Sequence, residues 1–561
     1  MKKIGMFVGC SLLTLSCYDG NVNHNEELKE NAENNKYSSL IPGRILVDAK
    51  DDISSDDLKD LSKIAGTNLH SSNKFGDKLK FEVGNVDPSK EDDILRKLNQ
   101  DPRVEHAEPM AVYKALYVPN DTMYKEQWGL KRSGLESSYG MSCGMGVKVA
   151  VVDTGIKCDL SDLQGTKCGG GYNFISNTDD ATDDQMHGSH VAGTIAQTTN
   201  NKFGAAGLAS CVNLMPVKVL DENGSGSMES IAEGIRYAAD EGASVINLSL
   251  GSDFPSDIVK DAVDYAHNKG VVVVAAAGNS GGNVGYPAAY PNAIAVSATT
   301  SSDDIANFSC RGPQIAIGAP GVDILQQTIN EDNIRDSKGK FVKLSGTSMA
   351  TPHVAAAAAL VVSSGVNKPD DVKAKLQSSA DKMDDEELFG AGILRADSAV
   401  RSTLLSHFFL RLVALLGIVS LFMNGKKNVW SKLSVAGLIV SGFGLLPIAF
   451  LGVLPTMGSW RILGELAMRP IGEWSVPLGI AVSFFPLANI APPFLASTLL
   501  GGHSKLKLLA GGLALGTASL CAQMAFSNDM TFFLGETLFR VWMVANTAAS
   551  VYLARLLFDK K

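Results

Sequence analysis

Short and almost uninterrupted apolar runs alternate with amphipathic stretches through the middle of the chain. Five of the runs predict buried strands, at residues 147–152, 214–220, 245–250, 271–277 and 293–298. Helical periodicity lies between them, for example at 228–240 and 255–267. Strands of this kind, separated by helices, predict an α/β domain with a parallel sheet covered by helices on both faces. In such sheets, functional residues gather at the carboxyl ends of the strands.

A smaller pattern precedes this region. Residues 44–49, 79–83 and 104–114 read as strands, and residues 54–65 and 88–98 read as helices between them. The order strand, helix, strand, helix, strand predicts a small ferredoxin-like α+β domain at 41–116. Residues 18–40 are rich in Asn and Glu and lack apolar periodicity, so we expect a flexible tether there.

The first 17 residues are typical of an export signal. Lys2 and Lys3 precede an apolar stretch at 4–15. Residues 13–17 resemble a bacterial lipoprotein box, in which Cys17 would be lipidated, although Thr14 stands where Leu is usual. Cleavage by an ordinary signal peptidase nearby and an uncleaved anchor are the alternatives.

After residue 403 the apolar stretches become long enough to span a bilayer, at 404–423, 433–455, 476–500, 507–527 and 532–556. This part has twelve Lys or Arg and five Asp or Glu, whereas the whole chain has a net charge of −9. The Lys clusters after the first, third and fifth stretches would share one, cytoplasmic side. We therefore expect a transmembrane helical region at 404–561, a place in a bacterial membrane (the inner membrane), and a catalytic domain at 117–403 facing the periplasm or exterior. The acidic remainder argues against nucleic acid as a partner.

Four polar motifs stand at the ends of the expected elements. Asp153 begins Asp-Thr-Gly after the strand at 147–152, and His187 and His190 lie in His-Gly-Ser-His. Asn279 follows the strand at 271–277, and Ser348 lies in Gly-Thr-Ser-Met-Ala before an Ala-rich run. Considered singly, each of these residues can be explained as a helix cap or a turn residue without any catalytic role. The two histidines lack the Cys or carboxylate partners of a zinc site.

Taken together and in this order, the motifs closely resemble the subtilisin family of serine proteases, over about 127–399. The resemblance implies a subtilisin-like fold and a serine endopeptidase with a Ser-His-Asp triad. Ser348 would be the nucleophile, His187 the general base and Asp153 the acid that orients it. Asn279 would donate to the oxyanion together with the backbone N–H of Ser348. His190 would be structural.

The resemblance also implies polypeptide substrates held between two strands by β-augmentation. The candidate substrate-binding residues are Gly224, Ser225, Gly226, Ser249, Leu250, Gly251, Ala276, Ala277, Gly278 and Gly285. Gly285 would form the floor of the first specificity pocket. A glycine floor leaves a roomy, uncharged pocket, so we expect a preference for large apolar residues.

A structural Ca²⁺ is a further implication of the resemblance. The candidate ligands are Gln127, Asp162, Thr199, Asn201, Phe203 and Ala205. Their side-chain and main-chain oxygens suit this cation. The alternative is that they are ordinary loop residues.

Residues 41–116 resemble the inhibitory prosegment of the family. The chain would therefore be made as a zymogen, inhibited by its own prosegment, that cleaves itself between Tyr113 and Pro119.

Five cysteines lie in the expected catalytic domain, and an exported domain can keep disulfides. Cys158 and Cys168 are the nearest pair in sequence; Cys143 and Cys211 precede strands that neighbour one another in this fold; Cys310 is left over. No cysteine lies in a nucleophile motif, which disfavours a thiol protease. Two other functions stay open: a binding module that cuts only itself, and a transporter or sensor centred on the C-terminal spans.

Overall fold

The structure is a computed structural model that describes residues 40–71, 74–111, 118–423, 510–512, 514–518, 521–522 and 536–559. It divides the chain into two compact units, Met1–Ala115 and Leu116–Lys561. The lipidation candidate Cys17, the tether at 18–39, most of the expected cleavage segment at 113–119 and the expected spans at 433–455 and 476–500 lie outside the described residues.

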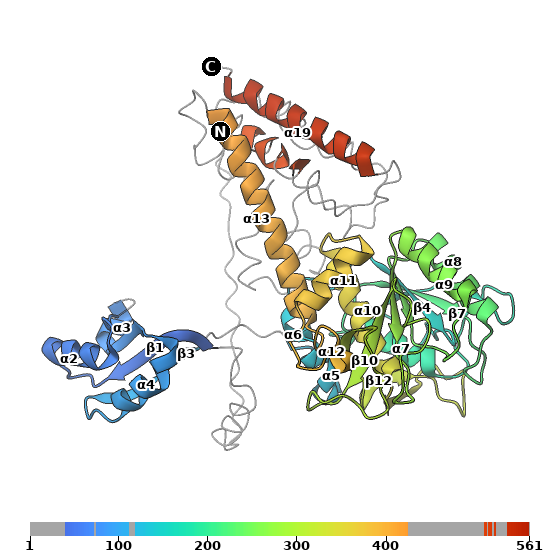
Figure 1. The fold of residues 1–561 in the computed structure, drawn as a ribbon, viewed down its shortest axis with the longest axis horizontal. Helices are drawn as coiled ribbons and strands as arrows, with labels where there is room; N and C mark the ends of the chain where they lie inside the picture. Colours follow the sequence, from blue (N-terminus) through green and yellow to red (C-terminus); the bar gives the residue numbers. More distant parts are fainter. Residues whose placement is uncertain are drawn as a thin grey trace, which may run out of the picture. The chain divides into compact units, whose positions relative to one another are not determined.

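The first unit contains a three-stranded antiparallel sheet in the order β2-β1-β3 (Figure 1). Its elements are β1 (Leu40–Ala49), α2 (Ser55–Ala65), α3 (Lys74–Leu79), β2 (Phe81–Asn85), η1 (Pro88–Lys90), α4 (Glu91–Asn99) and β3 (Val104–Ala111). Ser54 caps α2 by accepting a hydrogen bond from the backbone N–H of Asp57. Ile45 and Val47 of β1 pack with Leu61 and Leu98 in one buried core. The strand expected at 79–83 begins two residues later, because α3 includes Leu79.

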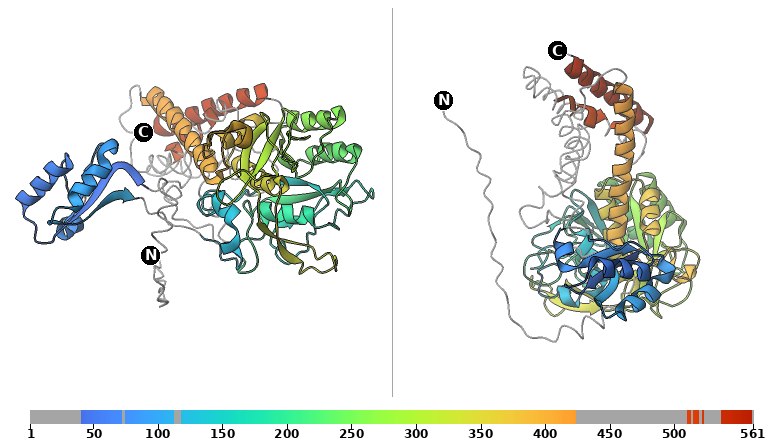
Figure 2. Two further views of the ribbon diagram at one scale, coloured as in Figure 1. Left: turned by 60° about the horizontal axis from the view of Figure 1, so that its bottom comes forward. Right: turned by 90° about the vertical axis from the view of Figure 1, so that its left-hand side faces the viewer.

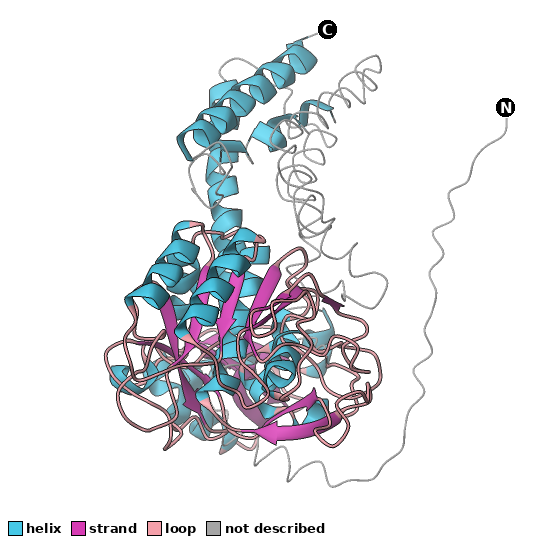
Figure 3. Ribbon diagram, turned by 90° about the vertical axis from the view of Figure 1, so that its right-hand side faces the viewer, coloured by secondary structure: helices cyan, strands magenta, loops and turns pink. Residues whose placement is uncertain are grey.

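The second unit is built around an eight-stranded sheet whose strand pairs are all parallel in the described residues. The strands run in the order β11-β10-β9-β8-β4-β7-β5, and β6 also pairs with β7. Figure 3 shows strands of this unit together with the helices around them. They are β4 (Lys148–Asp153), β5 (Lys167–Cys168), β6 (Tyr172–Asn173), β7 (Asn213–Lys218), β8 (Val245–Leu248), β9 (Val272–Ala276), β10 (Ala293–Thr299) and β11 (Ile315–Pro320). A hairpin, β12 (Ile324–Thr328) with β13 (Lys340–Leu344), stands apart from this sheet.

Helices cover both faces of the sheet. Val149 and Val151 of β4 join one hydrophobic core with α7 (His187–Ala196), α10 (Thr347–Ser363) and α11 (Pro369–Ser378). Ala150 and Val152 join a second core with α8 (Met228–Asp240) and α9 (Asp257–Asn268). Successive residues of a strand point to opposite faces, so the sheet is buried on both sides. The expected α/β class with a parallel sheet is therefore confirmed.

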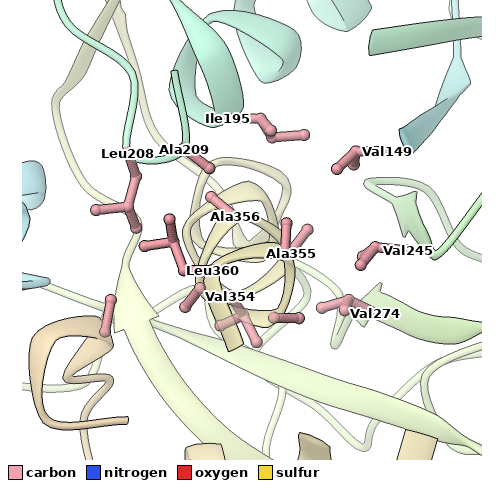
Figure 4. Close-up of a cluster of buried hydrophobic side chains, with 14 of the residues drawn as sticks. Val149, Ile195, Leu208, Ala209, Val245, Val274, Val354, Ala355, Ala356 and Leu360 are labelled. Atoms are coloured by element: carbon pink, nitrogen blue, oxygen red, sulfur yellow. The ribbon is translucent and has the colours of Figure 1, made fainter. Parts of the chain in front are cut away.

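Helix α10 lies inside the first of these cores (Figure 4). Its residues 355–359 are all alanine and fully buried, and Val149, Val245 and Val274 of three strands lie beside it. Short side chains let the helix approach the sheet closely. This packing fixes the position of α10 relative to the sheet. Ser348 is the second residue of the helix, so its position is fixed as well.

Short helices complete the unit, at η2 (Tyr124–Glu126), α5 (Trp128–Arg132), α6 (Leu135–Ser138) and α12 (Glu386–Phe389). Two long helices follow, α13 (Ala396–Met423) and α19 (Glu536–Asp559), both visible in Figure 2. Helix α13 starts with Ala396, Ala399 and Val400 fully buried in the core. It continues without a break through the domain boundary expected after residue 403.

One sequence expectation about this part of the chain is wrong. Leu404, the first residue of the first expected span, packs against the core of the second unit, and His407 is also buried. Within the residues that the structure describes, no helix is both long and apolar enough to cross a membrane. This finding overturns the expected location in a bacterial membrane.

Candidate active site

An acid–base pair lies at the carboxyl end of β4. Asp153, the last residue of this strand, is fully buried. Its Oδ1 lies 2.7 Å from Nδ1 of His187 and accepts a second hydrogen bond, of 2.8 Å, from the backbone N–H of Thr154. A carboxylate can only accept, so Nδ1 of His187 carries the proton. The Nε2 atom of His187 then has the lone pair that a general base needs.

The surroundings of His187 favour its protonated form. Burial lowers the pKa of His187, but the charge and hydrogen bond of Asp153 and the charge of Asp183 outweigh burial and raise the pKa above its ordinary value of 6.5. The side chain keeps 24% of its surface exposed. His187 can therefore take up a proton readily and still meet a substrate.

A second buried acid holds the start of α7. Asp183 accepts hydrogen bonds from the backbone N–H groups of Met186 (3.1 Å) and Ser189 (2.9 Å) and from the hydroxyl of Thr154 (2.8 Å). The hydroxyl of Thr154 accepts in turn from the backbone N–H of Gly188 (2.9 Å). Asp153 and His187 are thus joined through Thr154 as well as directly. The sequence analysis missed Asp183, although an Asp four residues before a helix-opening His could have indicated it.

Ser348 lies at the N-terminal end of α10 and contacts the residue that follows β8. Its hydroxyl donates to the carbonyl of Ser249 at 3.1 Å, while the hydroxyl of Ser249 donates to the carbonyl of Ser348 at 2.8 Å. The hydroxyl of Ser348 must therefore turn away from Ser249 before His187 can accept its proton. Catalytic hydrogen bonds are often made only once substrate is bound.

Asn279 has a fixed amide orientation. Its Oδ1 accepts from both the backbone N–H (2.8 Å) and the hydroxyl (2.9 Å) of Thr347. The Nδ2 group therefore faces away from Thr347. A Cβ atom placed on Gly346 would lie 3.4 Å from Nδ2 of Asn279 and 3.6 Å from the backbone nitrogen of Ser348. Both nitrogens thus lie near one point, as donors to a single oxyanion require, and Oδ1 of Asn279 lies 3.7 Å from the same point.

A cleft of about 560 Å³ runs beside His187. Its lining includes six of the candidate substrate residues, namely Gly224, Ser225, Gly226, Ser249, Leu250 and Gly251. The other four are not in this lining: Ala276, Ala277, Gly278 and Gly285. Gly285 is nevertheless adjacent, because its N–H donates to Ala277 at 2.9 Å and a Cβ atom on it would lie 3.1 Å from the carbonyl of Ser252. No lining residue is Asp, Glu, Lys or Arg.

The expected cation ligands fall into two groups. The carboxylate of Asp162, fully buried, accepts from the side-chain amide of Asn201 (2.6 Å) and the backbone N–H of Ala205 (2.8 Å). Thr199 and Phe203 belong to the same loop. The side chain of Gln127 forms the second group and bonds to the main chain. Its amide oxygen accepts from the N–H of Ala206, and its amide nitrogen donates to the carbonyls of Ala206 and Leu325.

Asp121 is a carboxylate that the sequence analysis missed. It is 4% exposed and accepts from the backbone N–H groups of Asn200 (2.9 Å) and Asn201 (3.4 Å). Burial raises the pKa of Asp162 to about 7, against the hydrogen bonds from Asn201 and Ala205, and the charge of Asp121 adds to the rise. Two buried carboxylates thus meet at one loop. Among the described residues, no group of three or more His, Cys, Asp or Glu could hold a metal ion.

Two disulfides join Cys143 to Cys211 and Cys158 to Cys168, the two pairs that the sequence suggested. Cys310 is a buried free thiol that packs beside Gly278. His190 is buried with its Nε2 3.2 Å from the carbonyl of Val342, and burial lowers its pKa to about 4. A neutral, buried His190 agrees with a structural role.

The chain is similar in sequence to known proteases. A family model described as "Subtilase family" matches residues 144–393. A thermophilic serine proteinase from Bacillus sp. (strain AK1) is 39% identical over 350 residues, which are 62% of this chain and 84% of that protein. Thermitase from Thermoactinomyces vulgaris is 41% identical over 269 residues, 48% of this chain and 93% of thermitase. Subtilisin Savinase from Lederbergia lenta is 42% identical over 277 residues, 49% of this chain and 98% of that protein.

Proposed function

The chain belongs to the subtilase family, and from this premise we propose that Ser348, His187 and Asp153 are its catalytic triad. The protein is a subtilisin-like serine peptidase, a hydrolase that acts on polypeptides. The observation that carries the residue assignment is the 2.7 Å contact between Asp153 and His187 at the carboxyl end of β4, and Ser348 in the first turn of α10 supplies the hydroxyl. Ligands of such sheets bind at the carboxyl ends of the strands, which favours this place for substrate, nucleophile and base.

The proposed reaction has two halves. His187 takes the proton from Oγ of Ser348 as this oxygen attacks the carbonyl carbon of the scissile peptide bond. The imidazolium is stabilised by Asp153 and returns the proton to the leaving amine, so that the C–N bond breaks and an acyl-enzyme forms. Water then attacks the ester in the same way and frees Ser348. The N–H groups of Asn279 and Ser348 stabilise the oxyanion in both halves.

We also propose that the enzyme prefers a large apolar residue before the cleaved bond. The cleft has no charged side chain other than a protonated His187 to select Lys, Arg, Asp or Glu. Leu250, Phe254 and Tyr286 give it an apolar lining. An extended peptide would pair with the main chain of 224–226 and 249–251 by β-augmentation.

Residues 41–116 are proposed as an inhibitory prosegment that the enzyme removes itself between Tyr113 and Pro119. The division of the chain into compact units at Ala115 and Leu116 supports this proposal. A separately folded unit can be released by one cut in the connecting segment. Self-cleavage also needs no further partner, because the proposed triad is in the same chain.

A fluorophosphonate probe and a set of peptides test the proposed function directly. The probe is expected to label the protein stoichiometrically, and digestion with mass spectrometry is expected to place the label on Ser348. Peptides with Phe or Leu before the cleaved bond are expected to be cut at least tenfold faster than matched peptides with Lys, Arg or Glu. A label on another residue would contradict the triad, and equal cleavage after Lys or Arg would contradict the specificity alone.

A calcium ion is proposed at Asp121, Asp162 and Asn201. The donor types fit Ca²⁺, since two carboxylates are hard ligands and nearby main-chain carbonyls can complete the shell. The side chain of Asn201 would have to turn to offer its oxygen, because its amide nitrogen faces Asp162 and its oxygen accepts from the N–H of Phe203. The pKa of Asp162, raised to about 7, indicates an unfavourable buried charge that a cation would offset. When bound, calcium would supply that positive charge and join residues 121, 162 and 201.

The calcium proposal predicts a stabilisation that grows with pH. The folded pKa of Asp162 lies above its ordinary value of 3.8, so the calcium-free protein loses stability as the pH rises from about 4 to about 7. Calcium competes with the proton on Asp162, so the stabilisation by calcium is expected to be weak at pH 5 and full at pH 8. At 100-fold excess over Kd, the Tm at pH 8 is expected to rise by about 5–10 °C. Thermal unfolding with calcium or EDTA at the two pH values measures this.

Asp162→Asn provides the control for that measurement. It removes the titrating carboxylate, so both the calcium effect and its pH dependence are expected to disappear. Equal Tm values with calcium and with EDTA at pH 8 in the unmodified protein would show that no stabilising site exists.

A further inference from the structure

Lys218 is a buried lysine at the end of β7, beside the proposed catalytic acid. It is 2% exposed and pairs in register with Asp153 of the neighbouring strand β4. Its ammonium group donates to the carbonyls of Thr154 and Leu220, both at 2.8 Å, and to Oδ1 of Asp184 at 2.7 Å. An ammonium has three donor hydrogens, and here each has an acceptor.

The three acceptors belong to three different segments of the site. Thr154 follows Asp153 and donates its own backbone N–H to the carboxylate of Asp153. Asp184 lies three residues before His187, in the segment that leads into α7. Leu220 lines the cleft, four residues before Gly224. One charge therefore joins the segments that carry the acid, the base and a substrate-binding strand.

We propose that Lys218 is a positioning residue for the peptidase reaction, which sets the catalytic acid and base relative to the substrate-binding segment at 224–226. The proposal rests on the assignment of the triad made above. Lys218 contacts no reacting atom; it acts through Thr154, Asp184 and Leu220. A tethered geometry matters because small displacements between reacting groups reduce the rate strongly.

A purely structural role is the alternative, and a second buried lysine of the same unit provides the comparison. The side chain of Lys157 is 7% exposed, and its ammonium pairs with Asp159 at 2.9 Å. Asp159 is 66% exposed and does not line the cleft. Lys157 and Lys218 thus share burial and an ion pair, but only Lys218 joins segments of the site.

The test compares Lys218→Met with Lys157→Met in the full chain. Lys218→Met is expected to lower kcat/KM for a Phe-containing peptide at least tenfold, with a rise in KM as well as a fall in kcat. The acid limb of the pH profile of kcat/KM is expected to move to higher pH, because loss of a nearby positive charge favours protonated His187. Asp153, Asp183, Asp184, Asp221 and His190 are the other titratable groups around these residues. Lys157→Met is expected to change neither the KM nor the pH profile.

Asp184→Ala keeps the proposal testable if Lys218→Met does not fold. The Asp184 side chain is 36% exposed, so its removal is expected to leave the Tm within a few degrees of the unmodified protein. It withdraws one of the three acceptors, and kcat/KM is expected to fall several-fold. Unchanged kinetics in Asp184→Ala, or in folded Lys218→Met, would overturn the proposal. The proposal would also be overturned if the fall in kcat/KM were fully accounted for by a smaller folded fraction of the variant protein.

Failure of the triad assignment gives a different result. If the unmodified protein and Lys157→Met neither react with the fluorophosphonate probe nor cut the peptide, the assignment of Ser348 is wrong and the role of Lys218 falls with it. If both are active while Lys218→Met matches them, only the role of Lys218 is wrong.

Discussion

Replacing Ser348 by alanine is expected to abolish peptide hydrolysis, with a fall in kcat of about 10⁶-fold, a size measured for the triad serine in subtilisin itself. The change removes the oxygen proposed to form the acyl-enzyme, and it is expected to leave the N-terminal end of α10 intact. The Tm is therefore expected to stay close to that of the unmodified protein. Steady-state kinetics with a Phe-containing peptide, together with thermal unfolding, measure both.

Ser364→Ala is a matched control at the opposite, C-terminal end of the same helix. Ser364 follows α10, is buried, and donates its hydroxyl to the carbonyl of Leu360 at 2.8 Å. Its loss is expected to cost at most about 1.5 kcal/mol of stability and no activity. Residual activity of Ser348→Ala above one per cent would show that another residue is the nucleophile.

The same Ser348→Ala protein tests self-cleavage. It is expected to keep residues 41–116, whereas the unmodified protein is expected to begin between Tyr113 and Pro119. Mass spectrometry of the two N-termini makes the comparison. An inactive Ser348→Ala protein of mature length would contradict self-cleavage while leaving the triad assignment unaffected.

Asn279→Ala is expected to lower kcat by about 10²–10³-fold with little change in KM, again a size measured in subtilisin. The Nδ2 group of Asn279 and the backbone nitrogen of Ser348 lie within 3.6 Å of one point beside Gly346, so the substitution removes one of the two proposed donors to the oxyanion. The oxyanion exists only in the transition state and intermediate, so substrate binding changes little. Kinetics on one peptide separate kcat from KM. A change in KM alone would assign Asn279 to substrate binding.

Thr347→Val examines how that amide is oriented. It removes one of the two hydrogen bonds to Oδ1 of Asn279 and keeps the backbone N–H. It also removes the hydroxyl that accepts from the N–H of Gly278 at 3.2 Å. We expect kcat to fall by roughly tenfold, which is about 1.4 kcal/mol and close to the worth of one hydrogen bond. Thr347→Ser restores the hydroxyl and is expected to restore kcat.

Continuous apolar runs were sufficient to predict the centre of the sheet. Five of its strands appear within two residues of their expected ends, because a strand buried on both faces is apolar at every position. Helix α8 has the expected bounds, since Ser227 caps its start and its apolar positions recur with helical spacing. Other strands could not be found in this way. β12 contains buried Gln326 and Gln327, whose amides bond to loops that come together only in the folded chain.

The same limit explains what was missed in the site. Asp121 and Lys218 acquire their partners through tertiary contacts, and no local pattern distinguishes them from surface charges. Only Asp183 has a local signal, its place four residues before His187. The start of α13 shows the opposite error. The apolar pattern at 404–423 is the same for a helix that lies in lipid and for a helix that packs on a protein core. In the structure Leu404 contacts the core.

The two disulfides make the properties of the protein depend on the redox conditions under which it folds. Cys158 and Cys168 close the loop that carries Asp162, and the N–H of Cys211, beyond the loop that carries Asn201, bonds to the carbonyl of Cys143. A closed loop has lost much of its freedom before a ligand arrives, which lowers the entropy cost of binding. Protein made under reducing conditions is therefore expected to bind the proposed cation more weakly. Two samples of one sequence could then differ in heat resistance according to where they were folded.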